Sequence, residues 1–294
     1  MLDGGLATQL EAQGCDIGND LWSAGMLQSN PSAIVDAHLA FLEAGANIII
    51  SASYQASRMG FMSVGLSEQQ ADDLIVKSVE LACAARKQFL EAHPQTGFTP
   101  IVAASIGPYG AAMHDGSEYT GEYEVDEEGL REFHEGRLHL LDKSGADVLA
   151  CETIPNELEA KVLHDLLIDA ELPAWVSFSC RDERCISDGT SLQDVSKIFR
   201  DHPRVLALGV NCTAPHLITS LIGEIKLAAS DKAIVVYPNS GETYEVADNS
   251  WHGSAGPANC ADESRTWLNA GAKLIGGCCR VGPDQITAIR DSLH

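Results

Sequence analysis

Short runs of apolar, mostly β-branched residues recur along the chain, and each is followed by a polar segment and then by a stretch with helical periodicity. Continuous apolar runs are typical of parallel strands, because both faces of such a sheet are covered. The pattern predicts a very short first strand at residues 1–3 and seven more. These span 47–53, 100–106, 147–154, 174–180, 205–212, 233–238 and 273–278.

The segments between these runs carry the boundary residues of helices. Pro31 suits a helix's first turn, and Ser67 with Gln70 three residues later forms a capping box. Glycine follows several predicted C-termini, where it readily adopts a left-handed conformation. Helices are predicted over 31–44, 67–92, 127–144, 156–170, 191–200, 215–229, 258–270 and 283–293, with glycines at Gly45, Gly145 and Gly271.

Eight strands alternating with helices predict an α/β fold, a single (β/α)8 TIM barrel that takes in residues 1–294 as one domain. The alternative is an open, doubly wound sheet. No G-x-G-x-x-G opens a helix in this sequence, which favours the barrel. In a barrel, we expect functional residues where the strands end.

The net charge of −23 makes nucleic acid and anionic membranes poor partners, since both require basic surfaces. No apolar run is long enough for a membrane helix, and the first residues contain neither the basic nor the apolar region of a signal peptide. We therefore expect a cytoplasmic protein. Its oligomeric state does not follow from these features.

Nine cysteines in a chain without an export signal predict reduced thiols rather than disulfides. Cys212 is the last residue of one predicted strand, and the adjacent Cys278 and Cys279 lie at the end of another. Three thiolates at one rim of a barrel suit Zn²⁺ in a tetrahedral site with one open position. The alternative is that each is a small buried apolar residue. Convergence of the three favours the metal.

Three segments in this order resemble the signatures of the homocysteine S-methyltransferase family. They are residues 3–11 (DGGLATQLE), 209–212 (GVNC) and 276–280 (GGCCR). Further similar stretches are 19–22 (NDLW), 52–56 (ASYQA) and 237–242 (YPNSGE), so the resemblance covers nearly the whole chain. It implies a homocysteine-binding zinc barrel that makes methionine.

The resemblance implies that Cys212, Cys278 and Cys279 bind the zinc ion, and that Asp3 and Glu152 hold the amino group of homocysteine. Charge supports the latter assignment, because an α-ammonium group requires carboxylates. Taken alone, Asp3 is also a common turn residue before glycine, and Glu152 is equally compatible with a solvated rim.

The remaining site residues are assigned to other parts of the substrates. The N–H groups of Gly4 and Gly5 are expected to face the α-carboxylate, since a glycine turn exposes such donors. Asn211 is placed in the substrate site beside Cys212. Trp22, Tyr54 and Tyr109 offer aromatic faces to a cationic donor, although packing roles are equally compatible with them.

The chain ends soon after the last predicted helix, without the C-terminal arm of betaine-dependent members of the family, so the resemblance favours a sulfonium donor. S-Methylmethionine is expected first and S-adenosylmethionine second. Two alternatives stay open: a metal-dependent barrel hydrolase, and a non-catalytic zinc- or thiol-binding protein. Hydrolases of that kind usually bind their metal through histidines and carboxylates.

Overall fold

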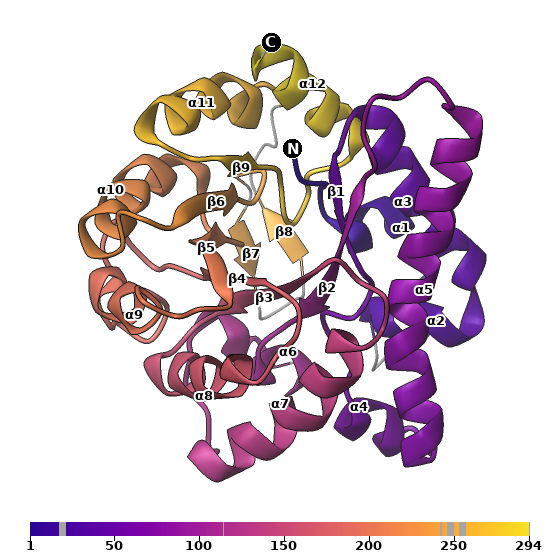
Figure 1. Ribbon diagram of the computed structural model, residues 1–294, viewed down its shortest axis with the longest axis horizontal. Coiled ribbons are helices and arrows are strands. Elements are labelled where there is room, and N and C mark those ends of the chain that lie inside the picture. The colour runs from indigo at the N-terminus through magenta and orange to yellow at the C-terminus, as the bar shows by residue number, and fades with distance from the viewer. Residues whose placement is uncertain (18–21, 114, 242, 246–249, 253–256, 294) are drawn as a thin grey trace.

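A curled sheet of seven parallel strands lies at the centre of the computed structural model, with helices around its outside (Figure 1). The structure describes the chain except for residues 18–21, 114, 242, 246–249, 253–256 and 294. The strand order is the order along the chain. It runs β1 (Ile48–Ile50), β2 (Ile101–Ile106), β3 (Val148–Ile154), β4 (Ala174–Phe178), β5 (Val205–Asn211), β6 (Ala233–Tyr237) and β9 (Leu274–Ile275).

The first residues of the chain lie between the two outer strands of this sheet. Leu2 forms a parallel bridge with Ile48 of β1, and its N–H donates to the carbonyl of Ile275 in β9 (2.9 Å). Asp3 extends these backbone links to both sides, because its N–H donates to the Ile48 carbonyl and its own carbonyl accepts from the Gly277 N–H. The predicted first strand is thus present as a backbone link too short to be a strand of its own.

The helices agree closely with the sequence pattern. The capping box at Ser67 is present, and Gly45 ends α3 in a left-handed conformation (φ 105°). The predicted helices correspond to α3 (Pro31–Ala44), α5 (Glu68–Ala92), α7 (Glu127–Asp142), α8 (Glu157–Ile168), α9 (Leu192–Ile198), α10 (Ile218–Ala228), α11 (Pro257–Ala270) and α12 (Pro283–Leu293).

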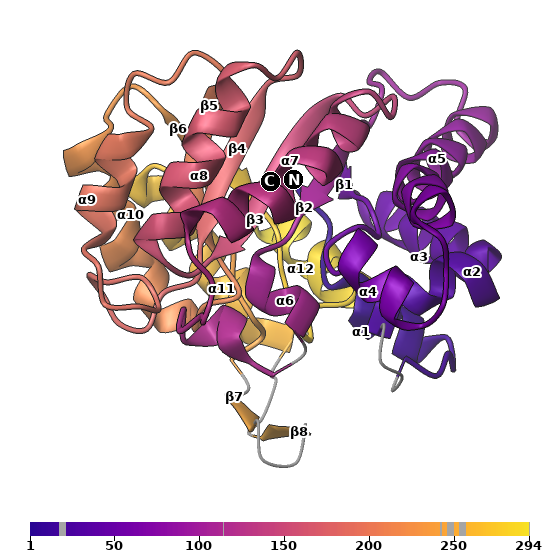
Figure 2. The same cartoon turned by 90° about the horizontal axis from the view of Figure 1, so that it is seen from below.

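Several short elements have no counterpart in the prediction. They lie in the loops, where a helix of one or two turns leaves no readable period. They are α1 (Leu6–Ala12), η1 (Trp22–Gly25), α2 (Met26–Ser29), α4 (Arg58–Ser63), α6 (Tyr109–Met113), η2 (Ser117–Tyr119), and the antiparallel pair β7 (Thr243–Glu245) and β8 (Ser250–His252). The helix predicted over 215–229 begins as η3 (Pro215–Leu217) and continues as α10. Figure 2 shows β7 and β8 projecting from the body of the molecule.

Two hydrophobic clusters hold the sheet. The larger one lies between strands and helices and includes Phe41, Phe178 and Trp267. The smaller one draws inward-facing side chains from Leu2 and the strands, so that the curled sheet encloses its own core. Its members are Leu2, Ile48, Ala103, Ala150, Trp175, Ala207, Val235 and Tyr237. Among the described helices, none is long and apolar enough to cross a membrane.

Candidate active site

A cavity of about 400 Å³ opens where the parallel strands end. Its wall combines three cysteines, four carboxylates and three tyrosines with the glycine turn after Asp3. The segments that follow β1, β3, β5 and β9 all contribute. This is the position at which barrel enzymes bind their substrates.

The three cysteines named from the sequence meet in this cavity. Cys212 follows β5, and Cys278 with Cys279 follows β9. Their three sulfur atoms all lie within 4.8 Å of one another. Tetrahedral zinc with Zn–S bonds of about 2.3 Å requires sulfur atoms about 3.8 Å apart. The three-sulfur donor set suits zinc, and the 4.0 Å between the Cys212 and Cys279 sulfur atoms is close to this spacing.

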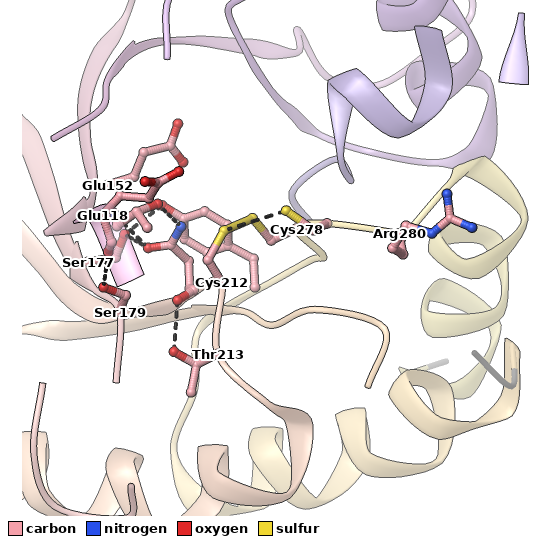
Figure 3. The surroundings of a disulfide bond; sticks show 12 residues. Glu118, Glu152, Ser177, Ser179, Cys212, Thr213, Cys278 and Arg280 are labelled. Carbon is pink, nitrogen blue, oxygen red and sulfur yellow. Dashed lines mark hydrogen bonds between the residues drawn. A yellow bond between two sulfur atoms is a disulfide. The ribbon is translucent and has the colours of Figure 1, made fainter. Parts of the chain in front are cut away.

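Cys212 and Cys278 are joined by a disulfide, with their Cα atoms 5.5 Å apart, and Cys279 Sγ lies 4.0 Å from Cys212 Sγ (Figure 3). The expectation that every cysteine is a free thiol is therefore wrong for this pair. The physical reason is proximity, because sulfur atoms gathered to ligate one ion are also within reach of each other. The remaining seven cysteines are free.

Two carboxyl groups near the cavity are buried: Glu152 is part of the cavity wall, and Asp3, which interacts with it, is not. Ser105 Oγ donates a short hydrogen bond to Glu152 Oε1, and burial raises the pKa of Glu152 to about 7. Asp3 Oδ2 accepts from the Ile50 N–H (2.7 Å), while its Oδ1 has no partner in the described part of the chain. Burial, with the nearby Glu152 charge, also raises the pKa of Asp3. A bound ammonium group would relieve the repulsion between these two carboxylates.

The side chain of Asn211 is occupied by the protein itself. Its Oδ1 accepts from the Thr153 N–H and from Ser177 Oγ (both 2.8 Å), and its Nδ2 donates to Thr153 Oγ1 (2.7 Å). These bonds join the ends of β3, β4 and β5. Asn211 borders the cavity, but its described polar contacts make it a positioning residue.

Three residues at this rim have left-handed backbones although none is glycine. They are Thr153 (φ 63°), Cys212 (φ 47°) and Arg280 (φ 63°). Such conformations cost free energy and concentrate at functional sites, where the surrounding structure holds them. At Cys212 the strained backbone follows directly on the anchored Asn211.

The glycine turn after Asp3 packs closely against the loop that carries Cys278. A Cβ on Gly4 would lie 2.2 Å from the Val281 carbonyl oxygen, and one on Gly5 would lie 2.6 Å from the Cys278 carbonyl oxygen. The Gly5 N–H, which was expected to face a carboxylate, donates instead to Val281 (2.9 Å). The expectation for Gly5 was therefore wrong, because the close approach of this loop takes its donor.

The aromatic candidates separate into different environments. Tyr54 borders the cavity, and its ring lies against Gly107. Tyr109 packs edge-on against the rings of Tyr123 and Phe133 and is absent from the cavity wall. The Trp22 side chain lies outside the described residues, as do residues 19–21 of the same motif.

Sequence analysis missed two cavity residues, Glu118 and Tyr119, which belong to the short helix η2. The Tyr119 side chain hydrogen-bonds Cys279. Burial raises the pKa of Glu118 to about 7. Neither residue follows a strand directly or belongs to a recognisable motif, so no sequence signal singled them out.

A family model described as homocysteine S-methyltransferase matches residues 1–293 of the chain. A homocysteine S-methyltransferase of Bacillus subtilis is 47% identical over 292 residues, which are 98% of this chain and 92% of the relative. A homocysteine S-methyltransferase of Escherichia coli is 46% identical and shares 99% of this chain and 94% of its own.

Two solved forms of the E. coli homocysteine methyltransferase MmuM are similar in structure. Its metallated form has a TM-score of 0.88 at 44% identity, covering 99% of this chain and 94% of that one. Its oxidized form has a TM-score of 0.88 at 45% identity with the same coverage.

Proposed function

This chain belongs to the homocysteine S-methyltransferase family, and we propose that it transfers a methyl group from a sulfonium donor to the thiol of homocysteine, giving methionine. The observation that carries the proposal is the arrangement of the cavity. A three-sulfur cluster borders it, and two buried carboxyl groups lie in or near its wall. Homocysteine has a thiol and an α-ammonium group at its two ends, so the cavity matches both.

Cys212, Cys278 and Cys279 are the residues that would hold Zn²⁺, in their reduced form. Burial raises the pKa of the Cys279 thiol to about 11, so this group needs a neighbouring positive charge to ionise at neutral pH. A bound zinc ion supplies that charge and likewise lowers the pKa of a substrate thiol that coordinates it. The metallated and oxidized forms of the E. coli relative support a site of this kind.

The other end of homocysteine is oriented by Glu152, with Asp3 behind it. A cationic ammonium group lowers the pKa of both carboxyl groups, so they bind it as carboxylates. Ser105 donates to Glu152, and Asn211 holds the neighbouring Thr153, which fixes this end of the cavity.

The transfer itself is a single substitution at carbon. A bond forms between the homocysteine sulfur and the methyl carbon, and the bond from that carbon to the sulfonium sulfur breaks. The electron pair stays on the donor sulfur, which becomes a neutral thioether. With zinc held by the three cysteines, the homocysteine thiol would release its proton to solvent on binding, so the transfer would require no general base.

S-Methylmethionine is the donor that we propose, with S-adenosylmethionine second. The cavity of about 400 Å³ is near the lower end of the usual range for ligand sites, about 300–1,000 Å³. It must admit homocysteine and the donor together, which favours the smaller sulfonium.

We propose further that residues 1–294 form one domain, a (β/α)8 barrel whose first strand is reduced to the segment around Leu2. Hydrogen bonds from this segment to both β1 and β9 support closure. Closure matters for function, because it brings Asp3 and the loop after β9 to the same rim.

The decisive assay measures methionine formation from homocysteine with S-methylmethionine, S-adenosylmethionine or betaine, using reduced protein before and after chelation. We expect activity with S-methylmethionine that chelation abolishes and zinc restores. Zinc binding without methionine formation from any donor would instead support a non-catalytic zinc protein. Activity that persists without metal would exclude the role given to the cysteines.

A further inference from the structure

Glu118 is a cavity carboxylate to which the proposed chemistry gives no task. It belongs to η2, and a hydroxyl hydrogen bond from Ser179 to its carbonyl (3.1 Å) fixes its backbone. The Gly121 N–H closes the same turn by donating to Ser117 (2.8 Å). Gly110 allows the turn to pack closely, since a Cβ there would lie 2.5 Å from the Glu118 nitrogen. The side chain is therefore presented by a well-anchored segment.

Among the residues that the structure describes, none forms an ion pair with the carboxyl group of Glu118. Its Oε2 is buried and has no hydrogen-bond partner within the described part of the chain. Arg280 is the one cationic residue in the described cavity wall, and it lies 3.8 Å from Glu11. Figure 3 shows its guanidinium on the opposite side of the cysteine pair from Glu118 and Glu152.

Negative charge in the cavity exceeds what homocysteine can balance. The wall contains Glu11, Asp115, Glu118 and Glu152. Homocysteine brings one ammonium group, which the carboxyl groups of Glu152 and Asp3 receive, and its own carboxylate adds a negative charge. The charge of Asp115 raises the pKa of Glu118 further, so a cation bound beside Glu118 would also relieve this repulsion.

The surroundings of Glu118 suit a cation that has no N–H group. Tyr54 and Tyr119 lie near it in the cavity wall, and aromatic faces attract soft, alkylated cations. A sulfonium carries a positive charge but no hydrogen-bond donor. The unpartnered oxygen of Glu118 can attract such a cation electrostatically, without a hydrogen bond.

We propose that Glu118 is the counter-charge of the sulfonium donor and thereby sets the specificity of the donor site. This inference rests on the proposed methyl transfer. Because transfer turns the sulfonium into a neutral thioether, Glu118 attracts the donor but not the demethylated product. Glu118 therefore favours binding of the donor and release of the demethylated product.

The test is a comparison of Glu118→Gln, which keeps shape and loses charge, with Glu122→Gln, an exposed residue of the same loop outside the cavity wall. Removing one partner of a desolvated charge pair raises the KM for S-methylmethionine roughly tenfold or more, while the KM for homocysteine stays within about twofold. Glu122→Gln leaves both constants unchanged. Glu118→Ala removes the same charge without burying an amide, and serves if the glutamine variant does not fold.

Trimethylsulfonium is the second probe, because it carries the charge without an amino group or a carboxylate. We expect it to inhibit the wild type in competition with the donor, and to inhibit Glu118→Gln at least about tenfold more weakly. An unchanged donor KM, or equal inhibition of both proteins, would overturn the role of Glu118. A wild type inactive with every donor would instead refute the proposed function, so the two failures are distinguishable.

Discussion

At the scale of single residues, we expect a substitution in the cysteine cluster to abolish activity without unfolding the protein. Cys212→Ala should weaken zinc binding by more than about 100-fold and abolish methionine formation. Even the loss of a residue that only hydrogen-bonds to a metal ligand lowers metal affinity by about 10–100-fold, and a ligand itself should matter more. The fold should persist, since the Cys212 side chain lies at the cavity and not among the outer core residues.

Zinc content, turnover and circular dichroism check this prediction. Cys15→Ser is the matched control, because Cys15 is a free thiol away from the cavity wall. Full activity in a zinc-free Cys212→Ala protein would contradict the assignment.

Glu152 makes a second prediction at this scale. Glu152→Gln should raise the KM for homocysteine by roughly tenfold or more and leave the KM for the donor nearly unchanged, because the amide cannot balance an ammonium charge. Steady-state kinetics with each substrate varied in turn will measure both constants. Equal effects on the two substrates would point to a general distortion of the cavity.

The same residue ties stability to pH. Its pKa rises from 4.5 to about 7 in the native protein, so between these pH values the folded chain holds a proton that the unfolded chain has lost. The free energy of unfolding of the ligand-free protein therefore falls as pH rises through this window, by a few kcal/mol at most. Urea unfolding at pH 5 and pH 8 should show a smaller decrease for Glu152→Gln. An equal decrease in the free energy of unfolding for the wild type and Glu152→Gln would contradict the prediction.

At the scale of elements, the turn after Asp3 and the loop after β9 form one packed unit. Gly5→Ala places a Cβ 2.6 Å from the Cys278 carbonyl oxygen and 2.9 Å from Thr8 Oγ1, so the loop must move. We expect the free energy of unfolding to fall by about 1–3 kcal/mol. We also expect the affinity for zinc to weaken at least about tenfold. Gly97→Ala is the control, since nothing lies within 4 Å of a Cβ there.

Elements were also predicted unevenly from the sequence. Long helices with clear caps, such as α3 and α5, agreed with their patterns because capping and amphipathicity are local properties. η2 was missed because three residues contain no period. Glu118 was missed with it, although it lies in the same cavity as residues found by motif.

At the scale of the whole molecule, the cysteine cluster joins distant parts of the chain. Cys212 and Cys278 are 66 residues apart, and each follows a different strand. A ligand that binds only the native state at 1,000 times its Kd stabilises it by about 4 kcal/mol. Zinc should therefore raise the melting temperature of the reduced protein by about 10 °C.

Oxidation provides the control for this prediction. With Cys212 and Cys278 joined as a disulfide, their thiolates are no longer available as ligands, so zinc should leave the melting temperature unchanged until a reductant is added. Differential scanning calorimetry with and without reductant will test this. An equal zinc shift in the oxidised protein would mean that the metal binds elsewhere.

The sequence by itself determined the alternation of strands and helices, the order of the strands and the identity of the three cysteines that meet in the cavity, because periodicity, caps and motifs are properties of neighbouring residues. Only the tertiary structure decided which groups are still available to a ligand. Gly5 donates to Val281, Asn211 binds Thr153 and Ser177, and Glu118 is left with an unpartnered oxygen. Those outcomes depend on hydrogen bonds between segments far apart in the chain, and no local pattern encodes them.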